Sequence, residues 1–286
     1  MNIPLKDNIK IYLLPNLLKR LLRIGIFNVL EYKDMKIIVL KKKILIVKSD
    51  GVFSEIKIDR GSRPLKNGIA ILDGKLYYGD YWGNPEREPA YIYEVDLNSF
   101  EKKIFFTFDW VRHIHYVQVD KYEKNCLLIG TGDSDSESGV FRLNVNTKEL
   151  EILAQGAQMY RTVSLIQTKE RLFYGSDDPD GENYIYEYNK RSCERKALCK
   201  IEGPAYYSTV DKKGYMYIAT TIEDRKRHRA IIYQSKDGGD SWQEYREFKK
   251  DIWHTKYFGY GVVEFVNGQE EIEELEYKLV GLKEMS

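Results

Sequence analysis

Two short segments of the sequence place arginine and histidine where a predicted β-strand begins. Arg112, His113 and His115 lie in VRHIHYV, and Arg161 lies in MYRTVS. An arginine binds a carboxylate through two parallel hydrogen bonds, and a histidine titrates near neutral pH, so it can serve as a proton-transfer base. Residues i and i+2 of a strand point to the same side, which puts the two imidazoles together. These side chains predict a site that binds an acidic ligand and moves a proton.

Further polar or aromatic groups stand at the same position of other predicted units, and we assign them, with the two arginines, to substrate binding. They are Arg63 in SRPLKNG, Tyr207 in GPAYYST, and His254 and Lys256 in WHTKYFGYG. A ring of such positions would surround a central channel and favour an acidic ligand such as a uronate or a sialate. The alternative is that the arginines join neighbouring units through salt bridges.

Acidic residues follow the second predicted strand of three units. Asp80 lies in GDYWGN, Asp133 in GDSDSE and Asp177 in GSDDPD. Carboxylates near arginines and histidines could act as general acid or base, so these aspartates join the two histidines as candidate catalytic residues. Tyr81 and Trp82 could stack on a sugar ring and so join the substrate-binding set. For any single aspartate the alternative is ordinary turn chemistry, because Gly and Asp are common turn residues.

The histidines admit three interpretations. With His254 from another unit, His113 and His115 could bind a divalent cation. One of them could instead be the catalytic base, or the two could form a hydrogen-bonded pair in the core. A divalent cation therefore stays open as a cofactor, and no residue is assigned as a metal ligand.

Five segments with one pattern, a strand, a short polar turn and a second strand, recur along the chain. Their central residues, at intervals of 46, 48, 45 and 47, are Val47, Tyr93, Phe141, Tyr186 and Tyr233. Periods of this length are typical of β-propeller blades, and six such units would span about 282 residues. The sequence therefore predicts an all-β fold with one domain over residues 1–286. That domain is a six-bladed β-propeller of four-stranded antiparallel blades.

The third and fourth units each divide into four predicted strands. In the third unit these are residues 113–119, 126–131, 139–145 and 150–154, and in the fourth 162–167, 171–175, 183–188 and 195–199. A spare N-terminal strand at residues 9–14 is predicted to pair with residues 275–282 and so close the ring. Closure removes a free sheet edge, which otherwise invites aggregation.

One motif points to a family. Ser235, Asp237, Gly239 and Trp242 stand in SKDGGDSW, which matches the pattern S-x-D-x-G-x-x-W. This segment resembles the Asp-box of the sialidase-like (BNR-repeat) propellers, and it lies between the third and fourth strands of the fifth unit, as Asp-boxes do in that family. The resemblance implies a propeller in which this turn is structural and remote from the ligand site.

The balance of charge limits the partners that the chain can attract. Lys and Arg number 45 against 44 Asp and Glu, a formal net charge of +1. This provides no general attraction to nucleic acid or anionic membrane, and the apolar N-terminal stretch is too often interrupted by charge to predict a membrane span. The three cysteines form no CxxC pair, so we expect reduced thiols and a cytoplasmic protein.

The leading functional hypothesis is a carbohydrate-active propeller that binds an acidic oligosaccharide or polysaccharide and cleaves it, as a glycoside hydrolase or a polysaccharide lyase. Arg112 and Arg161 would hold the carboxylate, and His113 or His115 would move the proton. The alternative is a non-catalytic propeller that binds a glycan or a protein, since propellers host many unrelated functions.

Overall fold

The computed structural model describes residues 18, 25–49, 51, 53–223, 227–252, 260–265 and 272–285. These residues form antiparallel strands, joined by turns and by the short 3-10 helices η1 (Asp135–Glu137) and η2 (Gln158–Tyr160). Within this part of the chain no helix is long and apolar enough to cross a lipid bilayer.

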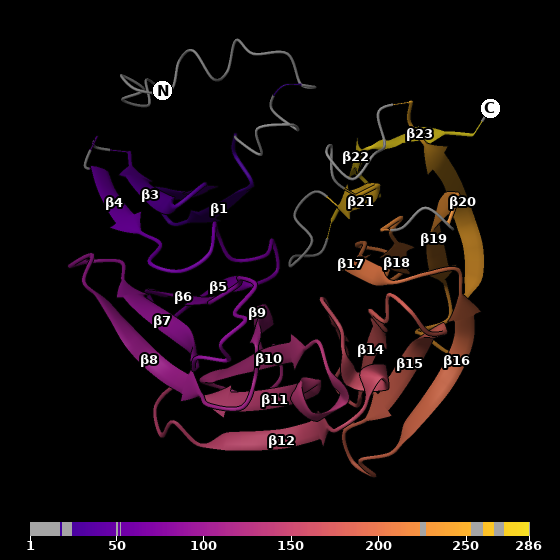
Figure 1. Cartoon of the computed structure of the whole chain (residues 1–286), viewed down its shortest axis with the longest axis horizontal. Helices are drawn as coiled ribbons and strands as arrows, with labels where there is room; N and C mark the ends of the chain where they lie inside the picture. Colours follow the sequence, from indigo (N-terminus) through magenta and orange to yellow (C-terminus); the bar gives the residue numbers. More distant parts are fainter. Residues whose placement is uncertain are drawn as a thin grey trace.

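Five sheets follow one another around a ring, each built on four consecutive strands, and the last of them gains a fifth strand from the C-terminal part of the chain (Figure 1). The first two blades contain β1 (Asn28–Tyr32), β2 (Met35–Leu40), β3 (Lys43–Lys48), β4 (Phe53–Lys57), β5 (Ile69–Leu72), β6 (Lys75–Gly79), β7 (Ala90–Asp96) and β8 (Lys102–Phe108). The third and fourth contain β9 (His113–Val119), β10 (Cys126–Gly132), β11 (Gly139–Asn144), β12 (Leu150–Gln155), β13 (Ile166–Gln167), β14 (Arg171–Gly175), β15 (Asn183–Asn189) and β16 (Arg195–Ile201). The fifth contains β17 (Ala205–Val210), β18 (Met216–Thr220), β19 (Arg229–Ser235) and β20 (Gln243–Lys250).

The core lies between successive blades rather than inside any one of them. Each of four buried clusters joins one blade to the next, and a fifth joins the last blade to the C-terminal strands. The central strands are therefore covered on both faces, and their sequences are apolar runs instead of alternating patterns. In β10 (CLLIGTG) every residue is buried. The strands of the third and fourth blades were predicted to within two residues at each end, except the first strand of the fourth blade, which was predicted at residues 162–167 and is limited to β13 (Ile166–Gln167).

The repeat has a common backbone irregularity. In blades two to five the pairing of the third strand with the fourth shifts register at Tyr93, Phe141, Tyr186 and Tyr233. These are four of the five residues that mark the sequence repeat, and a bulge of this kind bends the outer strand and increases its twist. The residues that mark the sequence period therefore coincide with a bulge that recurs in four blades.

The predicted number of blades is wrong. The described residues form five four-stranded blades, not six, and the chain after β20 gives the two-stranded sheet β21 (Val262–Phe265) with β22 (Tyr277–Val280). A further strand, β23 (Leu282–Glu284), pairs with β20 and makes the fifth blade five-stranded. The sequence period gives the length of one blade. It does not predict which sheet edge a C-terminal strand joins, because tertiary packing decides that edge.

The predicted closing strand is not among the described residues, and its predicted partner pairs with other strands. Residues 9–14, proposed as the closing strand, lie outside the described residues. Their proposed partner, residues 275–282, contains β22, which pairs with β21, and the first residue of β23, which belongs to the strand that pairs with β20.

The turn between β19 and β20 is held by its own side chains. Ser235 Oγ donates to Asp237 Oδ1 over 2.8 Å, and the backbone N–H of Ser241 donates to the same oxygen over 3.0 Å. The indole N–H of Trp242 donates to the carbonyl of Gly239 over 3.1 Å. Hydrogen bonds from Ser241, and then from Ser235, lower the pKa of Asp237. Gly239 has φ +100°, and a Cβ there would collide with the ring of Phe173.

Candidate functional site

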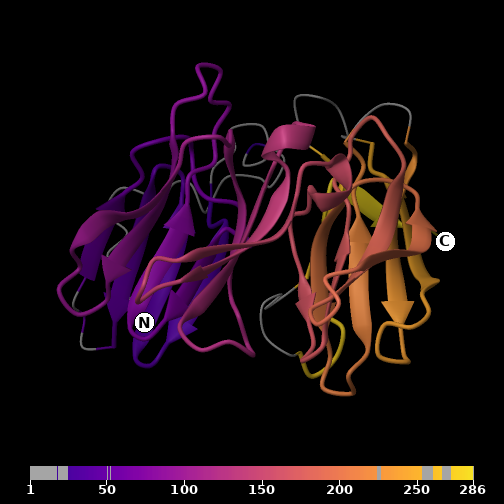
Figure 2. The same cartoon turned by 90° about the horizontal axis from the view of Figure 1, so that it is seen from below.

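Antiparallel pairing sorts the residues of each blade between two faces. The start of the first strand, the end of the second and the start of the third come together, as the register of β9, β10 and β11 shows. His113 begins β9, Asp133 follows β10 and Asp177 follows β14. These residues therefore lie at one face of the ring; Figure 2 shows the strands from the side, running between the two faces.

Two imidazoles face each other at this position. Nε2 of His113 lies 3.0 Å from Nε2 of His115, and Nδ1 of His113 lies 2.8 Å from the carbonyl oxygen of Trp82. Both histidines are buried. The ring of Tyr81 covers His113, with 4.4 Å between ring centroids. Gly132 makes room for the pair, since a Cβ there would lie 2.5 Å from Cε1 of His115.

These contacts fix the positions of the protons on the two rings. A carbonyl oxygen only accepts, so Nδ1 of His113 carries a hydrogen, and in the neutral ring Nε2 then has a lone pair. His115 then donates from Nε2 to that lone pair, and its own Nδ1 is left without a hydrogen. In the described structure Nδ1 of His115 is buried and has no hydrogen-bond partner. The pair therefore has a defined direction, with one proton between the two Nε2 atoms.

Asp133 is the common partner of the cluster. Its Oδ1 lies 3.4 Å from Nε2 of His113 and 3.5 Å from Nε2 of His115. Nη1 of Arg112 lies 2.7 Å from Oδ2, and Nη2 of Arg161 lies 3.3 Å from Oδ1. One carboxylate thus holds two guanidinium groups that come from the starts of two successive blades.

Arg161 also connects this carboxylate to a second, buried acid. Its Nε donates to Oδ2 of Asp177 over 3.2 Å, and its Nη1 donates to the backbone carbonyl of Asp133. Oδ1 of Asp177 is buried and has no partner among the described residues. Tyr206 and Glu223, hydrogen-bonded to each other, lie near enough to interact electrostatically with Asp177.

Burial and neighbouring charges shift the pKa values of His115, Asp133 and Asp177 in different directions. Burial, assisted by the neighbouring His113, lowers the pKa of His115 to about 4, against the hydrogen bond to Asp133. For Asp133 burial is outweighed by the contacts of its carboxylate with His113 and His115, so its pKa lies below the usual range. Burial raises the pKa of Asp177, and Arg161 only partly offsets it. The site therefore pairs an ionised carboxylate with a carboxyl that favours its proton, a pattern that divides acid and base roles.

Three of these side chains are of types that could bind a metal ion. His113, His115 and Asp133 offer three ligand atoms within 4.8 Å of one another. Oδ1 of Asp133, the oxygen closest to both imidazoles, is also the oxygen that Arg161 contacts. A divalent cation would therefore sit beside a guanidinium group, and Nδ1 of His115 lacks the acceptor that usually orients a metal-bound histidine. The donor set suits proton transfer and anion binding rather than a cation.

Other residues proposed for the site point elsewhere. Asp80 is buried, accepts from the N–H of Tyr91 over 3.1 Å and lies 3.5 Å from Arg60; its burial raises its pKa to about 6. The ring of Trp82 lies under Arg60, 5.0 Å from its guanidinium carbon, so only the carbonyl of Trp82 serves the histidines.

Two more of the proposed binding residues lie against other partners. The guanidinium carbon of Arg63 lies 3.9 Å from the centre of the Phe27 ring, and Lys66 Nζ lies 5.7 Å from the ring of Tyr207. His254 and Lys256 are outside the described residues. The structure thus brings together Arg112, His113, His115, Asp133, Arg161, Asp177 and Tyr81.

Glu223 was missed by sequence reasoning although a signal was present. It follows β18, the second strand of the fifth blade, as Asp133 follows β10 and Asp177 follows β14. The aspartates were selected because each is an acidic residue just after the second strand of its unit, and Glu223 has that same position. It was overlooked because its segment lacks the glycine that comes shortly before each of the aspartates.

No protein-family model and no curated protein matches the sequence. Among solved structures, the chain is similar to an oligogalacturonate lyase in complex with manganese, at 10% identity and TM-score 0.52, over 73% of this chain and 61% of that one. It is similar to a GH74 enzyme from Niastella koreensis, at 10% identity and TM-score 0.52, over 74% of this chain and 36% of that one.

A third similar structure is the extracellular domain of a hybrid two-component system protein from B. thetaiotaomicron. Identity is 13% and the TM-score is 0.54, over 80% of this chain and 28% of that one. The chain thus spans less than two thirds of the length of each of these three proteins. At these identities the likeness concerns the fold, and it places the chain among the β-propellers with four-stranded blades.

Proposed function

We propose that this chain binds an acidic glycan at the cluster around Asp133 and cleaves it by proton transfer. The observation that carries the proposal is the meeting of Arg112 and Arg161 on one carboxylate beside a directed pair of histidines. The Arg112 side chain is 34% exposed. Its Nε donates to the carbonyl of Gly83 and its Nη1 to Asp133, which leaves Nη2 without a hydrogen-bond partner among the described residues.

The histidine pair supplies the proton-transfer step. The lone pair on Nε2 of His113 accepts the Nε2–H of His115, so His113 takes up that hydrogen while Nδ1 of His115, which carries none, takes one from the ligand. The imidazolium formed on His113 is stabilised by Asp133 and by the Trp82 carbonyl. This is the relation of base and orienting groups that general-base catalysis uses. Asp177, which favours its protonated form, is the candidate proton donor.

Two of the similar structures support the proposal that the ligand is a carbohydrate. One is an oligogalacturonate lyase and the other is a GH74 enzyme. The acid–base geometry suits either elimination next to a uronate carboxylate or hydrolysis of a glycosidic bond. The two reactions give different products, because elimination leaves an unsaturated sugar that absorbs ultraviolet light and hydrolysis does not.

The test is a product assay on oligomers of galacturonate and glucuronate and on sialyl-oligosaccharides. We expect cleavage of one class, reduced about hundredfold or more in His113→Gln, because positioned acid–base groups contribute about 10²–10⁴. Glu194→Gln, in the turn between β15 and β16 at the opposite face, is the matched control and should keep full activity. Binding of an acidic glycan without any product would instead favour a non-catalytic glycan-binding propeller.

A further inference from the structure

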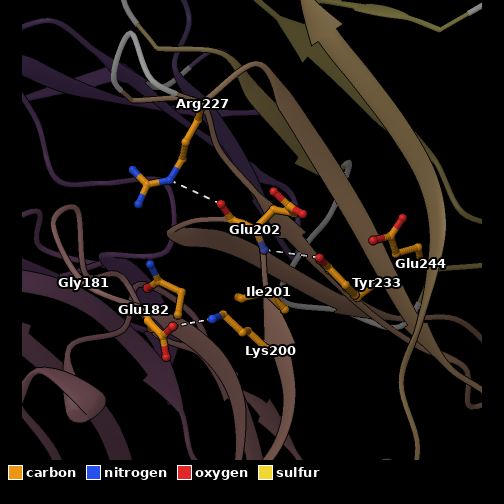
Figure 3. Close-up of a pocket in the computed structure, with 9 residues that line it drawn as sticks. Gly181, Glu182, Lys200, Ile201, Glu202, Arg227, Tyr233 and Glu244 are labelled. Carbon is orange, nitrogen blue, oxygen red and sulfur yellow. Dashed lines mark hydrogen bonds and ion pairs between the residues drawn. The ribbon is translucent and has the colours of Figure 1, made fainter.

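A hollow opens between the fourth and fifth blades. It has a volume of about 380 Å³, and Glu182, Lys200, Glu202, Arg227, Tyr233 and Glu244 line it. Pockets of about 300–1,000 Å³ are the usual size for small ligands. Figure 3 shows Glu182 with Lys200 on one side, and Tyr233 with Glu244 on the other. We call this hollow the blade 4–5 cleft.

Residues that line the cleft are near, in the sequence, to residues of the cluster around Asp133. Asp177, of the cluster, and Glu182, of the cleft, belong to the same loop between β14 and β15. Glu202 of the cleft is four residues before Tyr206, which lies near Asp177. Four residues span at most about 14 Å, so one ligand of several sugar rings could occupy both places.

The walls of the cleft carry balanced charge. Glu182 is paired with Lys200, and Glu202 lies 2.6 Å from Nη2 of Arg229. Nη2 of Arg229 is also 3.8 Å from Glu244. The lining holds three glutamates together with the cations Lys200 and Arg227, so it offers a ligand carboxylate no net positive charge, whereas sugar hydroxyls would donate hydrogen bonds to the glutamates. The cleft therefore favours an uncharged ring.

Tyr233 adds a donor at the floor of the cleft. Its hydroxyl oxygen accepts the backbone N–H of Glu202 over 3.2 Å, so the hydroxyl hydrogen is available to donate to a ligand oxygen. Arg227 donates to the carbonyls of Glu202 and Pro179, and so ties together the two loops that form one wall. The cleft thus has fixed donors and acceptors before any ligand binds.

We infer that the blade 4–5 cleft binds an uncharged sugar ring of the same glycan whose acidic unit lies at Asp133. This inference rests on the proposed function and deepens it, because it makes the ligand an oligosaccharide that contains both acidic and neutral units.

The test compares two probes by calorimetry on the full chain: glucuronic acid, and aldotetraouronic acid, in which a methylglucuronate is attached to xylotriose. We expect the longer probe to bind about tenfold tighter, as one or two hydrogen bonds of about 0.5–1.5 kcal/mol each allow. Glu244→Gln and Tyr233→Phe should remove most of that gain and leave the affinity for glucuronic acid unchanged. Glu194→Gln is the control, and the melting temperature of each variant checks folding.

The outcomes separate the two proposals. If glucuronic acid binds but the longer probe gains nothing, or if the gain survives both cleft variants, the cleft assignment is wrong and the central site stands. If the longer probe binds equally to Arg112→Ala but weakens in the cleft variants, the cleft assignment stands and the central acidic site is wrong. Binding of neither probe overturns both.

Discussion

Nε2 of His113 and Nε2 of His115 lie 3.0 Å apart, so the two imidazoles can share one proton but cannot both carry a charge at that contact without repulsion. The Trp82 carbonyl, 2.8 Å from Nδ1 of His113, decides which ring donates. In the neutral pair this direction makes Nε2 of His113 the acceptor and leaves Nδ1 of His115 without a hydrogen.

Burial of His115 predicts a specific dependence of stability on pH. Its pKa is lowered to about 4 in the folded protein, whereas an unfolded histidine titrates near 6.5. Between these values the unfolded chain binds more protons, so this group lowers stability as the pH falls through the window, by about 3 kcal/mol at most. The raised pKa of Asp177 acts in the opposite direction. Denaturant unfolding of wild type and His115→Gln between pH 7 and 4 therefore isolates the histidine, and parallel curves would contradict the prediction.

Removing Arg161 should leave a buried acid uncompensated. Its guanidinium contacts both Asp133 and Asp177, and Asp177 is fully buried. We expect Arg161→Met to lower the free energy of unfolding by about 1–3 kcal/mol, the usual cost of leaving a buried acceptor, here Oδ2 of Asp177, without its hydrogen-bond donor. The double variant Arg161→Met/Asp177→Asn should recover part of this loss in urea unfolding. No recovery would mean that the arginine stabilises the fold through other contacts.

The packing inside the third blade, where Gly130 of β10 pairs with Tyr116 of β9, predicts a contrast between two glycines. A Cβ on Gly130 would collide with the buried ring of Tyr116, whereas a Cβ on Gly83 meets nothing within 4 Å. Gly130→Ala should therefore lower stability by about 1–3 kcal/mol or more, as overpacking does, and Gly83→Ala should be close to neutral. Thermal unfolding of the two variants measures the difference, and equal melting temperatures would refute this account of the core.

The turn between β19 and β20 should affect stability and not ligand binding. Ser235 is buried and its Oγ serves both Asp237 and the N–H of Gly239, so Ser235→Ala should cost about 1 kcal/mol. Asp237→Ala should also lower the melting temperature. The affinity of folded protein for acidic glycans should be unchanged in both variants; weaker binding with normal melting would show that this turn takes part in the site.

The repeat in the sequence predicted the blades well where each one is covered by two neighbours. The apolar runs of β9, β10 and β14 follow directly from that burial, and the marks of the period coincide with the bulges at Tyr93, Phe141, Tyr186 and Tyr233. The chain end was different. β23 adds to the open edge of β20, and no local pattern in residues 282–284 distinguishes that edge from any other.

Equivalent positions predicted the site only in part. Arg112 and Arg161 converge on one carboxylate, while Arg63, at the corresponding place, lies over Phe27. Asp80 likewise follows its strand as Asp133 does, but Arg60 and the N–H of Tyr91 hold it away from the histidines. The spacing sets the face of the ring on which a residue lies, whereas its side-chain direction depends on partners from other blades.

The most direct test of the central claim is whether Arg112 recognises a carboxylate. The measurement is the dissociation constant of glucuronic acid and of its methyl ester, for wild type, Arg112→Lys and Arg112→Ala. The account predicts that wild type prefers the acid roughly ten- to hundredfold, the value of a charge-assisted hydrogen bond of about 1.5–3 kcal/mol. Arg112→Lys should keep part of this preference, because an ammonium lacks the planar fork, and Arg112→Ala should lose it. Equal binding of acid and ester by the wild-type protein, or a preference that survives in Arg112→Ala, would contradict the claim.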